Sequence, residues 1–167
     1  MADQESPGYV QRMNIIPLAA FCFLSADAAA KIPANHPIDI VAGESIARLK
    51  IGMELRRAMK VVPDLKPEGT KRGPDRSGYV SGALLVIVDQ SSRVVTISVD
   101  LPQSPGLRAG KTIVPPQANL DQIKQLLPGC ELSNGSGGRV LECEGSKGKM
   151  HFYDSFGDPK AVWAILP

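Results

Sequence analysis

Two segments of the chain, residues 51–65 and 117–129, carry apolar side chains at the spacing of an amphipathic helix. A proline ends each segment, Pro63 in the first and Pro128 in the second, because proline disfavours helical geometry in the residue before it. Asn119 stands where it can cap the second helix. The expected apolar stripes are Met53, Leu55, Ala58, Met59 and Val62 in the first helix, and Leu120, Ile123, Leu126 and Leu127 in the second.

Runs rich in β-branched residues follow each predicted helix. The first half contains ALLVIVD and RVVTISVDL, separated by the turn QSS. The second half contains CEL, RVLECEG, KMHFYD and AVWAIL, separated by segments rich in glycine, serine and proline. Such runs between turn residues are typical of antiparallel strands. Each half is therefore predicted to hold a helical segment and then a meander of three or four strands, which is an α+β fold class.

The two halves align without a gap when the sequence is shifted by 65 residues. Leu55 then falls on Leu120, and Pro63 falls on Pro128. The order of the predicted elements agrees as well, which indicates a tandem duplication whose units pack as one structure. The expected organisation is an N-terminal extension and signal peptide at 1–30, a proline-rich lead at 31–43, a first unit at 44–102, a linker at 103–116 and a second unit at 117–167.

This element order resembles the beta-lactamase inhibitory protein, whose two tandem repeats each place helices against a four-stranded antiparallel sheet. It is similar, more distantly, to small lipoproteins of outer-membrane assembly. The resemblance covers the chain after residue 30 at the level of element order, without a shared sequence motif. It implies a binding protein rather than an enzyme, and it carries over no functional residue.

The N-terminus has the pattern of a cleavable signal peptide. An apolar run at residues 15–24 precedes small residues that end at Ala30, and Met13 is a second candidate start. The run is shorter than the roughly 20 residues that a membrane-spanning helix needs. Phe21 before Cys22 fits a lipoprotein signal poorly. We therefore expect export to the periplasm, with cleavage near Ala30 and no membrane-spanning segment.

Removal of the signal peptide would leave two cysteines, Cys130 and Cys143. A pair of cysteines in an oxidising compartment favours a disulfide. If a hairpin turns at Ser136 and Gly137, the two cysteines lie directly opposite each other on adjacent strands, close enough to bond.

Motifs for catalysis, metals and cofactors are not found in the sequence. The stretch GLRAGKT has three residues between its glycines where a phosphate-binding loop has four, and a helix-breaking IVPP follows it. The cysteine spacing does not match a zinc site. His151 lies within a strand pattern and His36 in the proline-rich lead, so a hydrolase would need a dispersed site. We predict no catalytic residue, no metal and no cofactor.

The first half is notably basic, although the formal charge of the whole chain is only +2. The simpler interpretation is a solvated helix face with a charged loop, and the alternative is a patch for an acidic partner. Nucleic acid is not expected as a partner, because no aromatic platform accompanies the charges. The basic residues are Arg48, Lys50, Arg56, Arg57, Lys60, Lys66, Lys71, Arg72 and Arg76.

Two surfaces are candidates for binding a protein. The strand alternation predicts one sheet face bearing Lys149, His151, Tyr153 and Trp163, and Trp and Tyr anchor many interfaces. The alternative is that the single Trp belongs to the core. The loop at 68–77 is the second candidate, with Lys71, Arg72 and Arg76, or else it is merely a solvated loop.

These patterns predict an exported, non-catalytic protein-binding module. Its partner would be a toxin, an effector or an envelope enzyme, and the chain would act as an inhibitor or immunity protein. An envelope-assembly factor is the alternative, and a hydrolase with a dispersed active site is the second alternative.

Overall fold

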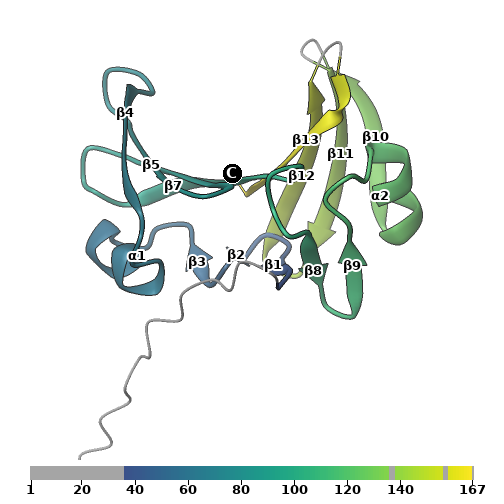
Figure 1. Ribbon diagram of the computed structural model, residues 1–167, viewed down its shortest axis with the longest axis horizontal. Helices are drawn as coiled ribbons and strands as arrows, with labels where there is room; N and C mark the ends of the chain where they lie inside the picture. Colours follow the sequence, from purple (N-terminus) through teal and green to yellow (C-terminus); the bar gives the residue numbers. More distant parts are fainter. Residues whose placement is uncertain (1–35, 136–137, 156–157, 167) are drawn as a thin grey trace, which may run out of the picture.

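Two β-sheets form most of the structure, a computed structural model that describes residues 36–135, 138–155 and 158–166 (Figure 1). The predicted signal peptide lies outside these residues. The larger sheet has eight strands in the order β10-β11-β12-β13-β7-β6-β5-β4, and each neighbouring pair is antiparallel. Its strands are β4 (Lys66–Lys71), β5 (Ser77–Ser81), β6 (Leu84–Val88), β7 (Val94–Asp100), β10 (Cys130–Gly135), β11 (Gly138–Gly145), β12 (Gly148–Ser155) and β13 (Asp158–Leu166).

The larger sheet is two meanders of four strands joined along one edge of each. Strands β4 to β7 come from the first half, strands β10 to β13 from the second, and β7 pairs with β13 at the joint. Val99 pairs with Ala164 there, and these two residues are 65 positions apart. The joint is thus an antiparallel pairing between the last strand of each meander.

A smaller sheet of five strands lies beneath the joint (Figure 1). Its order is β3-β2-β1-β8-β9, and β1 with β8 is its parallel pair. Ile38 and Ile40 are buried and alternate with exposed residues, which gives β1 a strand pattern in a segment predicted as a proline-rich lead. The strands are β1 (Ile38–Val41), β2 (Ser45–Ile46), β3 (Leu49–Lys50), β8 (Leu107–Ala109) and β9 (Thr112–Val114).

Two helices of seven residues each, α1 (Leu55–Val61) and α2 (Leu120–Leu126), lie within the predicted segments. The cap predicted at Asn119 is confirmed, because its side chain accepts a hydrogen bond from Gln122 N at 2.9 Å. In return Gln122 Oε1 accepts from Asn119 N at 3.0 Å, which completes a capping box. Glu54 takes the same place on α1 and makes no capping bond. Ala58 is the buried residue of α1, whereas α2 buries Leu120 and Ile123.

The predicted α+β fold class is wrong, because the described residues are mostly in strands and the helices are two turns long. Strand β4 shows the reason, since its sequence KPEGTK has no apolar alternation. As an edge strand it pairs on one side only, and an edge tolerates proline. Residues 68–71 of the predicted 68–77 loop therefore belong to β4.

Helix α2 is fastened to the sheet by a charged network. The carboxylate of Asp154 on β12 is buried and accepts from Arg139 N at 2.8 Å and Arg139 Nε at 2.7 Å. The same guanidinium donates to Asp121 on α2 at 2.9 Å. The hydrogen bond to Asp121 and, secondarily, that to Asp154 raise the pKa of Arg139.

The two sheets approach most closely where the β1–β2 turn meets the β11–β12 turn. A Cβ on Gly145 would lie 2.2 Å from the carbonyl oxygen of Ala42, and one on Gly43 would lie 2.2 Å from Gly148 N. Glu44 bonds to Lys147 Nζ at 2.9 Å beside this contact. Glycine is required here because only a backbone without side chains fits.

We expect Gly145→Ala to lower the free energy of unfolding by about 1–3 kcal/mol, because the added methyl group overpacks this contact. Denaturation in urea, followed by circular dichroism, measures the change. Gly129→Ala is the matched control, since nothing lies within 4 Å of its Cβ position. Equal stability of the two variants would contradict the proposed close packing.

The disulfide predicted between Cys130 and Cys143 is confirmed, and the two residues are direct partners in the β10–β11 register. The turn predicted at residues 136 and 137 lies outside the described residues. Both cysteines are buried at the α2 side of the sheet, so the bond connects an edge strand to the core. A disulfide is compatible with an exported protein.

Reduction of this disulfide should lower the free energy of unfolding by about 3 kcal/mol, the loop-entropy value for a short closed loop. The fold should persist, because the strand pairing and the core do not depend on the bond. Thermal melts with and without reductant measure the difference, and Cys130→Ser with Cys143→Ser should match the reduced protein. Two free thiols under non-reducing conditions would contradict the prediction.

Candidate functional site

The larger sheet has one face against the buried core and one open face. The open face carries the first predicted site. On β12 the side chains of Met150, Phe152 and Asp154 are buried. The alternate residues Lys149, His151 and Tyr153 therefore point to the other face. Trp163 on β13 pairs with Tyr153 across the strands and shares this face.

Strand register extends this face across the sheet as two rows. Each row consists of residues that are direct partners on neighbouring strands. Ile165 in one row and Tyr153 and Trp163 in the other are apolar or aromatic and half-buried. Ser98 between Ile165 and Leu85 is buried, and the β10–β11 end of the first row is acidic. One row is Glu131, Glu142, His151, Ile165, Ser98, Leu85 and Val80, and the other is Ser133, Val140, Tyr153, Trp163 and Asp100.

A chain of hydrogen bonds organises the β11–β12 part of this face. His151 Nδ1 lies 3.1 Å from Tyr153 Oη, and His151 Nε2 lies 3.1 Å from Glu142 Oε2. Lys149 Nζ donates to Glu142 Oε1 at 2.5 Å. The contact with Lys149, and secondarily that with His151, lowers the pKa of Glu142, and Glu142 in turn raises the pKa of Lys149. These partners hold the side chains in place, so this part of the face is preorganised.

Trp163 is half-buried and is not part of the hydrophobic core of the described residues. Its neighbours in register are Tyr153 on one side and Asp100 on the other. Asp100 also accepts from Gln103 Nε2 at 2.6 Å. Trp163 thus lies outside the hydrophobic core of the described residues, contrary to the alternative that the single Trp fills it.

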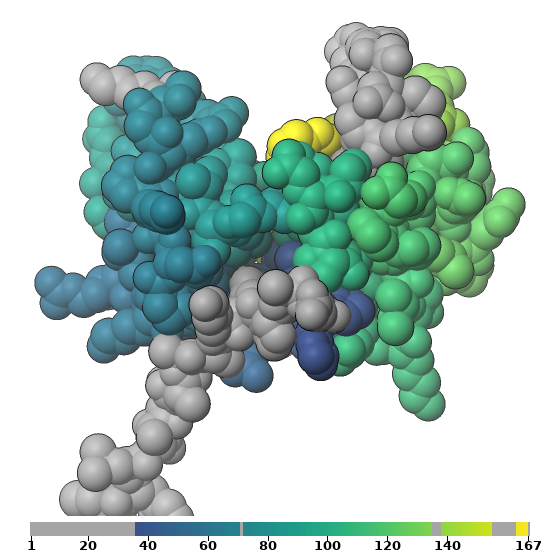
Figure 2. All heavy atoms as spheres, in the orientation of Figure 1, coloured from purple at the N-terminus to yellow at the C-terminus, as the bar shows by residue number. Residues whose placement is uncertain are grey.

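The sheet bends at the joint of β7 with β13, which makes its open face concave. Figure 1 shows β4 to β7 and β10 to β13 as two arms, with α1, α2 and the smaller sheet outside the bend. Figure 2 shows a hollow between the arms, with the end of β13 at its base. A protruding part of a protein could enter this hollow and contact both arms.

The second predicted site lies at the far end of the same sheet. Arg72 Nε donates to Glu68 Oε2 at 2.8 Å, and this pairing raises the pKa of Arg72 and lowers that of Glu68. Arg76 is exposed, and the Lys71 side chain lies outside the described part. Four strands separate β4 from β12, so the structure does not join these residues to His151 and its neighbours.

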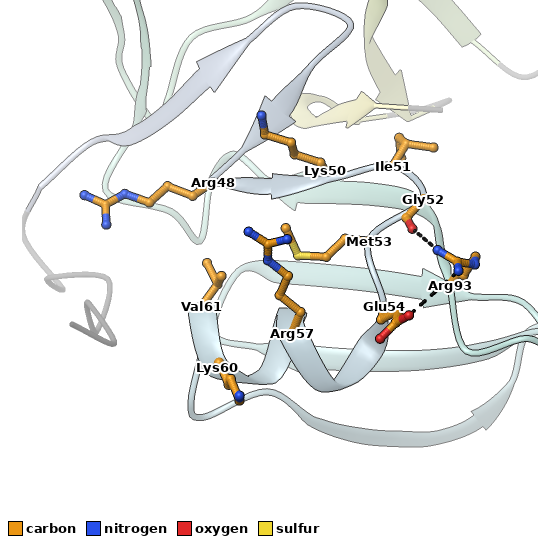
Figure 3. Close-up of a pocket in the computed structure, with 10 residues that line it drawn as sticks. All are labelled: Arg48, Lys50, Ile51, Gly52, Met53, Glu54, Arg57, Lys60, Val61 and Arg93. Carbon is orange, nitrogen blue, oxygen red and sulfur yellow. Dashed lines mark hydrogen bonds and ion pairs between the residues drawn. The ribbon is translucent and has the colours of Figure 1, made fainter. Parts of the chain in front are cut away.

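A groove of about 700 Å³ between β3 and α1 was not predicted (Figure 3). Its apolar lining includes Ile51, Met53 and Val61. Most of its cations belong to the basic segment of the first half, for which a solvated face and a patch for an acidic partner were the two interpretations. Only the fold adds Arg93 to them. The cations that line it are Arg48, Lys50, Arg57, Lys60 and Arg93.

Among the described residues, no group of three or more His, Cys, Asp and Glu side chains is placed to hold a metal ion. No helix in the described ranges is long and apolar enough to cross a membrane. Comparisons with protein-family models, curated proteins and solved structures found no match for the chain.

Glu44 links the groove to the contact between the two sheets. Its carboxylate lies 2.9 Å from Lys50 Nζ and 2.9 Å from Lys147 Nζ. These hydrogen bonds, that with Lys147 first, lower the pKa of Glu44 from 4.5 to about 2. The ionised carboxylate is therefore favoured in the folded protein.

We expect Glu44→Gln to destabilise the protein at neutral pH and to have a diminishing effect in acid. A lowered folded-state pKa stabilises the protein fully above pH 4.5, and this contribution is lost as the pH falls towards about 2. Melting temperatures of both proteins at pH 7, 4 and 2 measure the effect. Glu131→Gln, a change of equal charge at an exposed position, is the control. A difference that stays constant with pH would contradict the prediction.

Proposed function

We propose that this chain is an exported, non-catalytic protein-binding module that docks a protein partner in its concave sheet face. It would act as an inhibitor or immunity protein against a toxin or enzyme of the cell envelope. The observation that carries the proposal is the set of half-exposed apolar and aromatic side chains along the middle of that face. Leu85, Ile165, Tyr153 and Trp163 supply this surface.

The chemistry of the face favours a particular kind of partner. Aromatic side chains with few rotatable bonds anchor interfaces at little entropic cost, and Tyr153 is already held by His151. Asp100 and Glu142 stand at the margins of the apolar centre. The partner is therefore a protein with a protruding apolar segment that carries at least one basic residue.

Two further features support an inhibitor or immunity protein. Occlusion requires a shaped surface with a few anchors and no reaction chemistry. The disulfide supports function in an oxidising compartment such as the periplasm.

One observation favours a second candidate, a hydrolase with a dispersed site. Glu142, His151 and Tyr153 form a chain of acid, imidazole and hydroxyl, an order used in proton transfer. In such an enzyme His151→Ala would abolish turnover of an envelope substrate. In the docking module the same change would weaken binding and affect no reaction.

The docking proposal predicts that a photo-crosslinking amino acid in place of Trp163 captures one protein from the cell envelope. The same amino acid in place of Ile113, which is 52% exposed on the smaller sheet, should capture none. With the captured partner purified, Trp163→Ala should weaken the Kd by about 30-fold or more, the loss of about 2 kcal/mol typical of an anchor. Ile113→Ala should leave the Kd unchanged.

The identity of the captured protein separates the remaining possibilities. A toxin or an envelope enzyme whose activity falls on binding supports the inhibitor or immunity role. Proteins of outer-membrane assembly would indicate the assembly factor instead. Equal capture from Trp163 and Ile113, or an unchanged Kd in Trp163→Ala, would overturn docking at this face.

A further inference from the structure

The groove between the β2–β3 hairpin and α1 has an excess of positive charge. Five cations and one carboxylate, Glu54, line it. Arg93 donates to Gly52 O at 2.9 Å and lies 3.7 Å from Glu54, and Lys50 is bonded to Glu44. Three cations therefore remain for a ligand, because no described carboxylate lies within 4.0 Å of Arg48, Arg57 or Lys60.

Helix α2 does not carry the charges that α1 brings to the groove. Helices α1 and α2 are 65 residues apart, so each position on α1 has a counterpart on α2. Arg57 and Lys60 correspond to Gln122 and Gln125, which are uncharged.

The turn at the groove also holds residues that do not suit its backbone conformation. Ala47 and Arg48, the two residues between β2 and β3, have φ values of 52° and 66°. Such conformations favour glycine or asparagine in a two-residue hairpin turn. They place Arg48 at the groove, where Figure 3 shows it at the end of the hairpin and Arg57 reaching from α1 towards Met53. Backbone strain of this kind is concentrated at functional sites.

From this charge, the uncharged counterparts of Arg57 and Lys60 on α2 and the strained turn, we infer that the groove binds a ligand bearing phosphate groups. A phosphate monoester carries up to two negative charges at neutral pH, which matches several cations better than a single carboxylate does. Guanidinium groups bind phosphate oxygens through paired hydrogen bonds. Ile51, Met53 and Val61 provide apolar surface for the organic part of such a ligand.

The groove is separate from the concave face. Helix α1 and the smaller sheet lie outside the bend (Figure 1). Trp163 lies on the opposite face of the larger sheet, because its strand neighbours Ala164 and Leu166 are buried in the core. Phosphate binding is thus an additional property, and a ligand there would leave the concave face accessible to a protein. The phosphate could belong to a soluble compound or to a lipid headgroup at a membrane surface.

Titration calorimetry with inorganic pyrophosphate tests the soluble source, and sedimentation with phosphatidylglycerol vesicles, against phosphatidylcholine vesicles, tests the lipid source. We expect saturable binding of at least one probe. Arg57→Gln with Lys60→Gln, which gives α1 the residues of α2, should weaken it by about tenfold or more. Lys111→Gln with Lys124→Gln removes the same charge at exposed positions outside the groove and should have little effect.

Arg48→Gly is a second test that separates ligand binding from a structural role. Glycine relieves the positive φ, so the melting temperature should rise while the affinity for the probe falls. Binding of pyrophosphate identifies a soluble phosphate, and binding of anionic vesicles alone identifies a lipid headgroup. The absence of binding to either probe, or equal weakening in the groove and control double variants, would overturn the inference.

Discussion

The pairing of β7 with β13 is the contact on which the rest of this structure depends. Each strand ends a four-stranded meander and would otherwise expose an edge of unpaired amide and carbonyl groups. The joint satisfies both edges, with Val99 opposite Ala164 at its centre. It also sets the angle between the two arms, and therefore the shape of the concave face.

The joint explains why one face of the sheet is a core and the other is open. The smaller sheet and the two helices cover the outside of the bend, where Ile97, Leu166 and Phe152 are buried. No described element occupies the inside of the bend (Figure 1). Trp163 and Tyr153 on that face are accordingly half-buried. An antiparallel sheet can have one open face because its backbone groups are satisfied within the sheet. The proposed docking surface is thus a consequence of the topology.

The two halves use similar elements for different purposes. Around α2 the side chains serve stability, with the capping box of Asn119 and the bridge from Arg139 to Asp154 and Asp121. Around α1 the capping bond is missing, and basic side chains line a groove instead. Helix α1 therefore lacks a stabilising N-terminal cap at the place where the strained hairpin and the excess positive charge also lie. Such departures are expected where a site has requirements other than folding.

The sequence alone determined the features that depend on neighbouring residues. The two helix positions, the cap at Asn119, the strands from residue 83 to 101 and the facing cysteines all follow from local periodicity and turn chemistry. Only the tertiary structure decided the mainly β fold class, the strands in proline-rich segments and the groove that adds Arg93 to the basic helix. Strand pairing uses backbone groups that nearly every residue has, so β4 and β8 leave little trace in the side-chain pattern. The groove likewise depends on segments about 40 residues apart, which only folding brings together.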